Sequence, residues 1–258
     1  MDSTLAKGLA VIEWLARQQR SARVIEVAQA LGLTRSNAHR TLQTLVGCGW
    51  ARQDENSSTY RASLRLFELG SLTNAASDIR LQLRPHLATL AGSTGEPIHL
   101  AVLDGAEIVY LDKFDSPLPV AAYSRIGGRA PAQCVASGKA LLAASAFSVE
   151  SLTTLLGPLV AHTRHSHTSI EALVADLQRS RARGFAENRE EWRIGVCGLG
   201  VPVFNAVGEA VAAVGMSVPS IRFAKTQARL FAEQLRQCAA DASSTLGHRN
   251  AGNTAIHS

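Results

Sequence analysis

Six polar side chains at helical spacing are candidates for contacting the base edges of a nucleic acid. Between residues 35 and 46, Ala38, Leu42 and Leu45 recur every three or four positions, which predicts one buried side of a helix. The polar residues that fall largely on the other side are Arg35, Ser36, Asn37, Arg40, Gln43 and Thr44. Arginine can bond two acceptors of guanine, and asparagine can pair with adenine. These six residues are therefore the predicted DNA-contacting set of a helix that enters the major groove.

The flanking residues predict a helix-turn-helix followed by a wing. Apolar stripes of two earlier helices are formed by Leu5, Leu9, Ile12 and Leu15, and by Val24, Val27, Ala28 and Leu31. Gly32 suits the left-handed position that ends a helix, and Thr34 is a favourable N-cap for the third helix. Two short β-prone runs, 50–52 and 59–62, enclose the turn-rich residues 54–58.

Positive charge is concentrated near the N-terminus. Eight arginines between residues 17 and 65 stand against three acidic residues, and the whole chain has a formal net charge of +5. Arg52 and Arg61 lie on the predicted wing strands, where we expect them to contact phosphates. This distribution favours a polyanionic partner.

Beyond the wing, helical periodicity continues to about residue 90 and then gives way to strands. Pro85 is expected to break the helical part, and Asp104-Gly105 between two apolar runs predicts a type I′ hairpin. The later expected elements are a strand at 120–124, helices at 133–144 and 169–183, strands at 195–204 and 210–218, and a helix at 226–246. Thr168 and Glu171 predict a capping box for the 169–183 helix.

This order of elements predicts an α+β chain. We expect four segments. These are a winged helix-turn-helix domain at 1–63, a linker helix at 64–82, a domain of antiparallel sheet and flanking helices at 83–248, and a disordered tail at 249–258. No run approaches the ~20 apolar residues of a membrane helix, and the N-terminal residues lack the apolar segment and small-residue cleavage site of a signal peptide, so we expect a cytoplasmic protein without a membrane partner. Cys48, Cys134, Cys197 and Cys238 lack CxxC spacing and are expected to be reduced thiols.

Two further patterns could indicate a metal site or a dinucleotide-binding loop, but we predict neither. His162, His165 and His167 could ligate a metal, but no cysteine or carboxylate is adjacent in sequence, so we predict a solvated loop and no metal or other cofactor. The glycines at 195, 198 and 200 lie inside a β-prone run, so we interpret them as close backbone approach to a ligand or strand and not as a dinucleotide loop.

An enzyme built on the C-terminal domain remains the alternative hypothesis. A hydrolase could use Cys134 or Ser137 at a helix start as nucleophile, with a histidine as base. The chain has no G-x-S-x-G motif, and sequence places no histidine beside either residue. We therefore do not predict an enzyme. A DNA-binding module without a ligand is disfavoured by the size of the second domain.

Three spaced segments carry a family resemblance. The first is GLTRSNAHRTL at 32–42. The second is GGRAP at 127–131 followed by SGKALLA at 137–143. The third comprises RARGFA at 181–186, Glu191, Gly195-Val196 and PVF at 202–204. In this order they resemble the IclR family of bacterial transcriptional regulators over nearly the whole chain, with Arg40 at the family's characteristic arginine.

The resemblance implies a winged helix, a linker helix and a GAF-like effector domain, assembled as dimers or tetramers on palindromic operator DNA. In relatives that bind small carboxylates, the ligand contacts positions matching Ala136, Ser137, Asn188, Gly198, Gly215 and Ser217. This chain departs from the family pattern at three of them, where Asn188 replaces Asp, Gly198 replaces Cys and Gly215 replaces Ser.

These departures shape the expected effector. The start of the helix at Ala136 and Ser137 offers unpaired N–H groups and a positive dipole end, which favour an anion. Loss of side chains at Gly198 and Gly215 is expected to enlarge the pocket. We therefore expect a small organic acid as effector, aromatic or sugar-derived in preference to one of two or three carbons.

Overall fold

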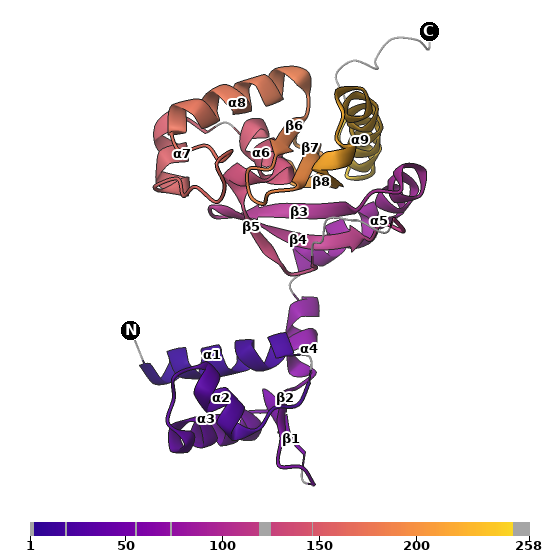
Figure 1. The fold of residues 1–258 in the computed structure, drawn as a ribbon. Coiled ribbons are helices and arrows are strands. Elements are labelled where there is room, and N and C mark those ends of the chain that lie inside the picture. Colours follow the sequence, from indigo (N-terminus) through magenta and orange to yellow (C-terminus); the bar gives the residue numbers. More distant parts are fainter. Residues whose placement is uncertain are drawn as a thin grey trace. The chain divides into compact units, whose positions relative to one another are not determined.

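A computed structural model of the chain describes residues 3–18, 20–54, 56–72, 74–118, 125–145 and 147–249. The chain divides into two compact units, Met1–Asn74 and Ala75–Ser258, each with its own hydrophobic core (Figure 1).

The N-terminal unit is a winged helix-turn-helix. Its elements are α1 (Ser3–Gln18), α2 (Val24–Ala30), α3 (Arg35–Gly47), β1 (Ala51–Gln53), β2 (Tyr60–Ala62) and α4 (Arg65–Leu72), with β1 and β2 antiparallel. Gly32 has a φ of 62°, and the Thr34 hydroxyl accepts a hydrogen bond from the Asn37 N–H, so both predicted ends of the turn are confirmed.

The core of this unit lies between the three helices and the wing. Ala38 and Leu42 of α3 are fully buried, as predicted, and Tyr60 carries β2 into the same cluster. Of the four apolar residues expected to be buried on α1, only Ile12 and Leu15 are buried. Leu5 and Leu9 are exposed, because the buried cluster takes from α1 only residues from Val11 onward.

The C-terminal unit is a six-stranded antiparallel sheet with helices on both faces. Its strands, in the order β5-β4-β3-β8-β7-β6, are β3 (Ile98–Asp104), β4 (Glu107–Phe114), β5 (Arg129–Pro131), β6 (Ala186–Arg189), β7 (Val196–Phe204) and β8 (Ala210–Pro219). Its helices are α5 (Asn74–Thr94), α6 (Ala136–Ala144), α7 (Val149–Leu156), α8 (Ile170–Arg183) and α9 (Lys225–Thr245), with short 3-10 turns η1 (Ala132–Cys134) and η2 (Ser220–Arg222). One core joins α5 and α9 to the sheet, and a second joins α6, α7 and α8 to the other face (Figure 1).

The predicted break at Pro85 is wrong, because α5 runs through this residue. A proline inside a helix removes one backbone hydrogen bond. Leu83 and Leu87 on either side of it are fully buried against the sheet, so packing outweighs that loss.

The β3–β4 hairpin forms, but its turn differs from the prediction. Asp104 pairs with Glu107, which leaves Gly105 and Ala106 as the two turn residues. A type I′ turn needs positive φ at both, and of the two only Gly105 has it, at 61°. The turn is therefore displaced by one residue and is not type I′.

Two predicted helix starts also move. The 133–144 helix begins at Ala136, because Val135 is extended and residues before it form η1. The α8 helix is capped by Ser169, whose hydroxyl accepts from the Ala172 N–H, and not by Thr168. The sequence interpretation missed α7, β5 and β6. The expected strand at 120–124 and the expected tail beyond residue 249 lie outside the described residues.

Candidate DNA interface and effector cavity

The amino-terminal half of α3 presents four of the predicted DNA-contacting residues at the surface. Arg35, Ser36 and Arg40 are exposed and Asn37 is half-buried. Arg40 Nη2 donates to Asn37 Oδ1 at 2.9 Å, which holds the two side chains together across one helical turn. The other N–H groups of the guanidinium and the Asn37 amide nitrogen have no hydrogen-bond partner among the described residues and can donate to base acceptors.

The other two residues of this set have partners inside the unit. Gln43 Nε2 donates to the Tyr60 hydroxyl at 2.9 Å and to Gln53 Oε1 at 3.0 Å, so it ties α3 to both wing strands. The Thr44 hydroxyl donates to the Arg40 carbonyl at 3.0 Å within the helix.

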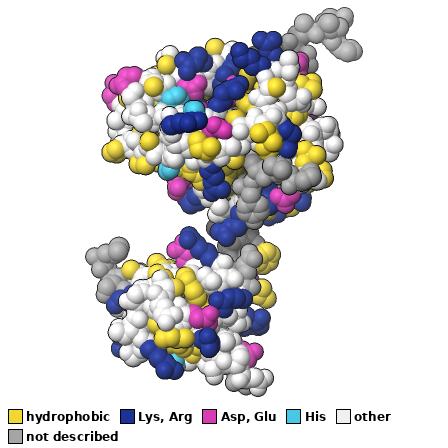
Figure 2. Space-filling view, viewed as in Figure 1, with side chains coloured by type: hydrophobic (Ala, Val, Ile, Leu, Met, Phe, Trp, Pro, Cys, Tyr) yellow, Lys and Arg dark blue, Asp and Glu magenta, His cyan; other side chains and the backbone are white. Residues whose placement is uncertain are grey.

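The two wing arginines lie directly opposite each other. Arg52 and Arg61 are cross-strand partners in the β1–β2 register, and both are exposed. Like charges at such positions destabilise a strand pair. Among the residues described here, neither forms an ion pair with a carboxylate. Figure 2 shows Lys and Arg side chains at several separate places on one face of the N-terminal unit, with fewer Asp and Glu side chains among them.

A cavity of about 50 Å³ lies at the amino end of α6. It is lined by His99, Tyr110, Val135, Ala136, Asn188, Trp192, Arg193, Val196, Gly198, Met216 and Ser217. Four of the six predicted effector positions are thus brought together here: Ala136, Asn188, Gly198 and Ser217.

The two remaining positions, Ser137 and Gly215, lie just behind the cavity wall. A Cβ at Gly215 would lie 2.1 Å from both His99 Nε2 and Ser137 Oγ. The expectation that Gly215 enlarges the pocket is therefore wrong, because these two side chains fill the space.

The glycines of β7 serve close packing. A Cβ at Gly198 would lie 2.8 Å from the Met216 carbonyl oxygen, and one at Gly200 would lie 2.5 Å from the Ala136 carbonyl. They let β7 pass directly against β8 and the first turn of α6, which confirms the close-approach interpretation for these two glycines. It is wrong for Gly195, where a Cβ would meet nothing within 4 Å and the φ is instead positive, at 85°. Gly198 thus also leaves less vacant space than the sequence suggested.

The first turn of α6 is buried and has no side-chain cap. Its N-cap is Val135, and the first amide bonded within the helix is that of Lys139, to the Val135 carbonyl. The amides of Ala136, Ser137 and Gly138 therefore lack helical acceptors, as the first amides of any helix do. With the helix dipole they make the cavity electropositive.

His99, which sequence reasoning missed, is buried beside this turn. Its Nε2 lies 2.9 Å from Ser137 Oγ, and its ring packs edge-on against Tyr110 with the centroids 5.0 Å apart. Burial lowers the pKa of His99 to about 4 and raises that of Tyr110 to about 12, so both side chains are neutral near pH 7. The clue in the sequence was one histidine inside the apolar run Ile98–Val102.

The lining favours an anion. Arg193 lies at the cavity with its guanidinium 4.3 Å from the Trp192 ring centroid. Asn188 Oδ1 accepts from the Glu191 N–H at 2.9 Å, so the oxygen of this amide is occupied and its NH₂ group remains. No Asp or Glu is among the described lining residues, whereas a carboxylate in the wall would repel an acid.

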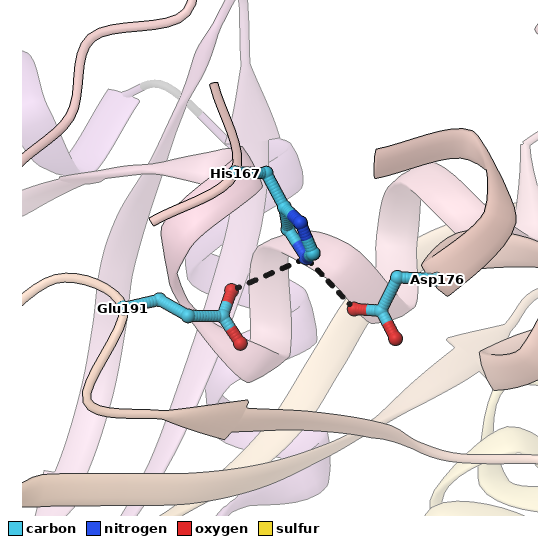
Figure 3. A group of neighbouring side chains, drawn as sticks. All are labelled: His167, Asp176 and Glu191. Atoms are coloured by element: carbon cyan, nitrogen blue, oxygen red, sulfur yellow. Dashed lines mark hydrogen bonds and ion pairs between the residues drawn. The ribbon is translucent and has the colours of Figure 1, made fainter. Parts of the chain in front are cut away.

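A second buried cluster lies two residues further along α6. Lys139 is fully buried, and its Nζ donates to Asp176 Oδ2 at 2.8 Å and Glu191 Oε1 at 2.7 Å. His167 Nε2 lies 3.4 Å from Asp176 and 3.9 Å from Glu191 (Figure 3). No carboxylate is adjacent to His167 in sequence, but the fold brings two to it, one from α8 and one from the segment after β6. The Lys139 ammonium bonds both of these carboxylates.

The electrostatics of this cluster are dominated by the ammonium and the imidazole. Burial by itself would raise the pKa of Asp176, but the hydrogen bond from His167 and the charge of Lys139 outweigh it and hold that pKa below its usual range. Asp176 is therefore ionised across the physiological range.

The structure gives the two candidate nucleophiles of the enzyme hypothesis, Ser137 and Cys134, only part of what catalysis needs. The structure brings His99 to Ser137, contrary to the sequence expectation, but His99 Nδ1 has no hydrogen-bond partner among the described groups to orient it as a base. Burial raises the pKa of Cys134 to about 11, so its thiolate is scarce at neutral pH.

Comparison with known proteins gives consistent matches along the chain. Residues 4–55 match the IclR helix-turn-helix domain, and residues 72–244 match the bacterial transcriptional regulator IclR C-terminal domain. The HTH-type transcriptional regulator XynR of Escherichia coli (strain K12) is 32% identical, over 95% of this chain and 97% of its own. KdgR of Dickeya chrysanthemi is 31% identical, over 96% of this chain and 81% of its own.

Solved structures agree with these matches. The Thermotoga maritima IclR superposes with a TM-score of 0.79 at 28% identity, covering 96% of this chain and 100% of that one. An IclR homolog from Microbacterium hydrocarbonoxydans, complexed with 4-hydroxybenzoate, gives 0.80 at 25% identity, covering 95% and 99%. Within the described part of the chain, no helix has the length and apolar character required to cross a bilayer.

Proposed function

Because the chain belongs to the IclR family of bacterial transcriptional regulators, we propose that α3 contacts operator DNA and that a small organic acid bound beside α6 controls this binding. The observation that carries the effector part is the cavity itself. Hydrogen-bond donors, an uncapped helix start and Arg193 surround it, and no carboxylate is among its described lining residues.

On the DNA side, Arg35, Ser36, Asn37 and Arg40 are the base-contacting residues of this proposal. They occupy the amino-terminal half of α3, the part that meets base edges in helix-turn-helix proteins. Gln43 and Thr44 complete the set closer to the wing. Their internal hydrogen bonds use their donors and suit them to hold the helix in place, so each has only its side-chain oxygen, an acceptor, to offer to the DNA.

The facing pair Arg52 and Arg61 is assigned to phosphate. Two like charges opposite each other on a strand pair are unfavourable in the free protein. A phosphate between or beside them would relieve that repulsion, which supports the assignment of the wing to the DNA backbone.

The size of the cavity bears on the class of acid. A benzene-sized ligand needs roughly 150 Å³, whereas this cavity measures about 50 Å³. It favours a compact acid over the aromatic or sugar-derived acid expected from the sequence. An aromatic acid such as 4-hydroxybenzoate, the ligand of the Microbacterium homolog, would first have to displace Trp192 and Arg193.

The remaining parts of the proposal follow the family. Residues 1–63 would bind DNA, residues 64–82 would form the linker helix, and residues 83–248 would form the GAF-like effector domain. The protein would act in the cytoplasm as a homodimer or homotetramer on a palindromic operator, since a two-fold symmetric protein matches a two-fold symmetric site.

The test joins DNA selection to effector screening. The operator is first selected from random duplexes with the full chain and measured by fluorescence anisotropy. Acetate, pyruvate and 4-hydroxybenzoate are then compared with acetamide, pyruvamide and 4-hydroxybenzamide. We expect at least one acid, but not its amide, to raise the thermal midpoint and to change operator affinity at least fivefold.

Two results would overturn the proposal. Failure to select any sequence at low salt would remove the DNA assignment. Selection of an operator whose affinity responds equally to the acids and their amides would remove the anion site. A third result would favour the enzyme hypothesis. In that case the wild-type chain binds no DNA but hydrolyses ester or amide substrates, and Ser137→Ala abolishes the hydrolysis.

A further inference from the structure

His99 stands where the effector cavity and the first turn of α6 meet. On the sheet it pairs with Gly215 of the neighbouring strand, and its ring fills the space that a side chain at 215 would take. Its two ring nitrogens have different surroundings. Nε2 lies 2.9 Å from the Ser137 hydroxyl, whereas Nδ1 is buried and has no hydrogen-bond partner among the described groups.

The direction of the hydrogen bond between Ser137 and His99 determines where the ring proton lies. Ser137 is 1% exposed, and within the described residues its hydroxyl has no hydrogen-bond partner apart from His99. Either Ser137 donates to Nε2, which leaves the ring proton on Nδ1 without an acceptor, or Nε2–H donates to Ser137 Oγ, which leaves the hydroxyl proton without one. In both arrangements one buried donor of the pair is unpaired, and when Ser137 donates, that donor is Nδ1–H.

With Ser137 as the donor, a buried N–H group is left without an acceptor. Burial keeps the pKa of His99 near 4, so the ring is neutral at pH 7 and carries one proton. Native proteins rarely leave a buried donor unpaired. The nearby polar groups of the cavity are the Tyr110 hydroxyl, the Asn188 amide, Arg193 and Ser217, and none of them is a carboxylate.

We propose that the Ser137 hydroxyl donates to His99 Nε2, and that His99 Nδ1–H donates to an acceptor oxygen of the acid held at the amino end of α6. This inference rests on the proposed function and adds a specificity residue to its site. His99 supplies this donor from β3, the strand paired with β8, where Gly215 offers no side chain. An acid with an oxygen acceptor directed at β3 fits, and an analogue with an N–H or C–H group there is rejected.

The tautomer can be tested without any effector. Long-range ¹H–¹⁵N NMR on the full chain with ¹⁵N-labelled histidine distinguishes Nδ1–H from Nε2–H rings, and His99→Gln identifies the resonance. We expect a neutral Nδ1–H ring from pH 5.5 to 8. An Nε2–H ring, or a charged one at pH 7, overturns the proposal.

The contact is tested with two substitutions, one that removes the donor at Nδ1 and one that removes the Ser137 contact at Nε2. His99→Gln keeps a polar group near the Nε2 position facing Ser137 and loses the donor at Nδ1, whereas His99→Asn places an amide nitrogen near Nδ1 and loses the Ser137 partner. His86→Gln on α5, whose ring lies 2.8 Å from the Thr245 hydroxyl, is the matched control.

Calorimetry with acetate, pyruvate and 4-hydroxybenzoate gives the readout. For the acid that binds best, we expect at least fivefold weaker binding in His99→Gln, partial recovery in His99→Asn, and no change in His86→Gln or in operator binding without acid. Wild-type affinity in a folded His99→Gln overturns this proposal and leaves the proposed function standing. If none of the acids binds the wild-type chain, the effector part of the proposed function fails, while the tautomer is decided independently by NMR.

Discussion

Replacing Lys139 with methionine tests whether the buried cluster of α6 is held by charge. Lys139 is fully buried and donates to Asp176 and Glu191 at 2.7–2.8 Å, while those side chains are 12% and 9% exposed. Methionine keeps most of the volume and removes the ammonium, which leaves two close carboxylates with little solvent. Removing one partner of a buried ion pair typically costs about 3–5 kcal/mol. We expect a loss of that size at pH 7.5, or roughly 10 °C in Tm.

The pH dependence gives the sharper signature. In the wild type the pKa of Asp176 is depressed, so its stabilising contribution is full above its usual value of 3.8 and is lost as pH falls below it. Without the ammonium, Asp176 loses the lowering effect of the Lys139 charge and stays close to a second carboxylate, so its folded-state pKa rises. The variant should therefore become more stable from pH 7.5 to pH 5.5, whereas the wild type should gain nothing from Asp176 over this range.

Urea denaturation of the full chain measures this, followed by Trp192 fluorescence in a Trp14→Phe/Trp50→Phe background. Lys225→Met at the exposed start of α9 is the control, expected within about 0.5 kcal/mol of wild type. Adding Asp176→Asn and Glu191→Gln to Lys139→Met should recover at least about 2 kcal/mol. A loss under about 1 kcal/mol for Lys139→Met, with no pH response, would refute the charge argument.

Three further predictions concern the proposed contacts. Arg40→Ala should weaken operator binding by at least about fivefold, or ~1 kcal/mol, without changing the melting curve; equal affinity in anisotropy would remove α3 from base contact. Arg52→Ala and Arg61→Ala should each weaken operator and random DNA alike and flatten the log–log salt slope by about one unit; a loss confined to the operator would make the wing a base-contacting element. Ser217→Ala should weaken effector binding by roughly 0.5–1.5 kcal/mol in calorimetry while operator binding without acid persists; full affinity would place the acid elsewhere.

The helix-turn-helix could be predicted because its determinants are local. Gly32, Thr34 and the Ala38–Leu42 spacing lie within eleven residues, and each acts through one turn of backbone. The α7 helix was missed although Ser148 caps it, since its eight residues give too short a periodic pattern. Helix starts at 136 and 170 were misplaced by one to three residues, which is the usual uncertainty of a terminus.

The effector cavity could be predicted only in part, since its polar groups are joined by strand pairing across long separations. His99 and Ser137 are 38 residues apart, and Lys139 and Glu191 are 52 apart. No periodicity within either segment indicates that β3 lies beside β8 and faces α6. For the same reason Gly215 suggested vacant space, because the side chain that fills it comes from another strand.

One short stretch of chain joins the cavity to the buried cluster. Glu191 is held by Lys139, while the next two residues, Trp192 and Arg193, line the cavity. The α6 helix contributes to both, through its uncapped first turn and through Lys139 in the second. An acid larger than about 50 Å³ would press on Trp192 and Arg193, the two lining residues that directly follow Glu191. Asp176 of α8 bonds the same ammonium as Glu191, so the segment that lines the cavity is joined through Lys139 to both α6 and α8.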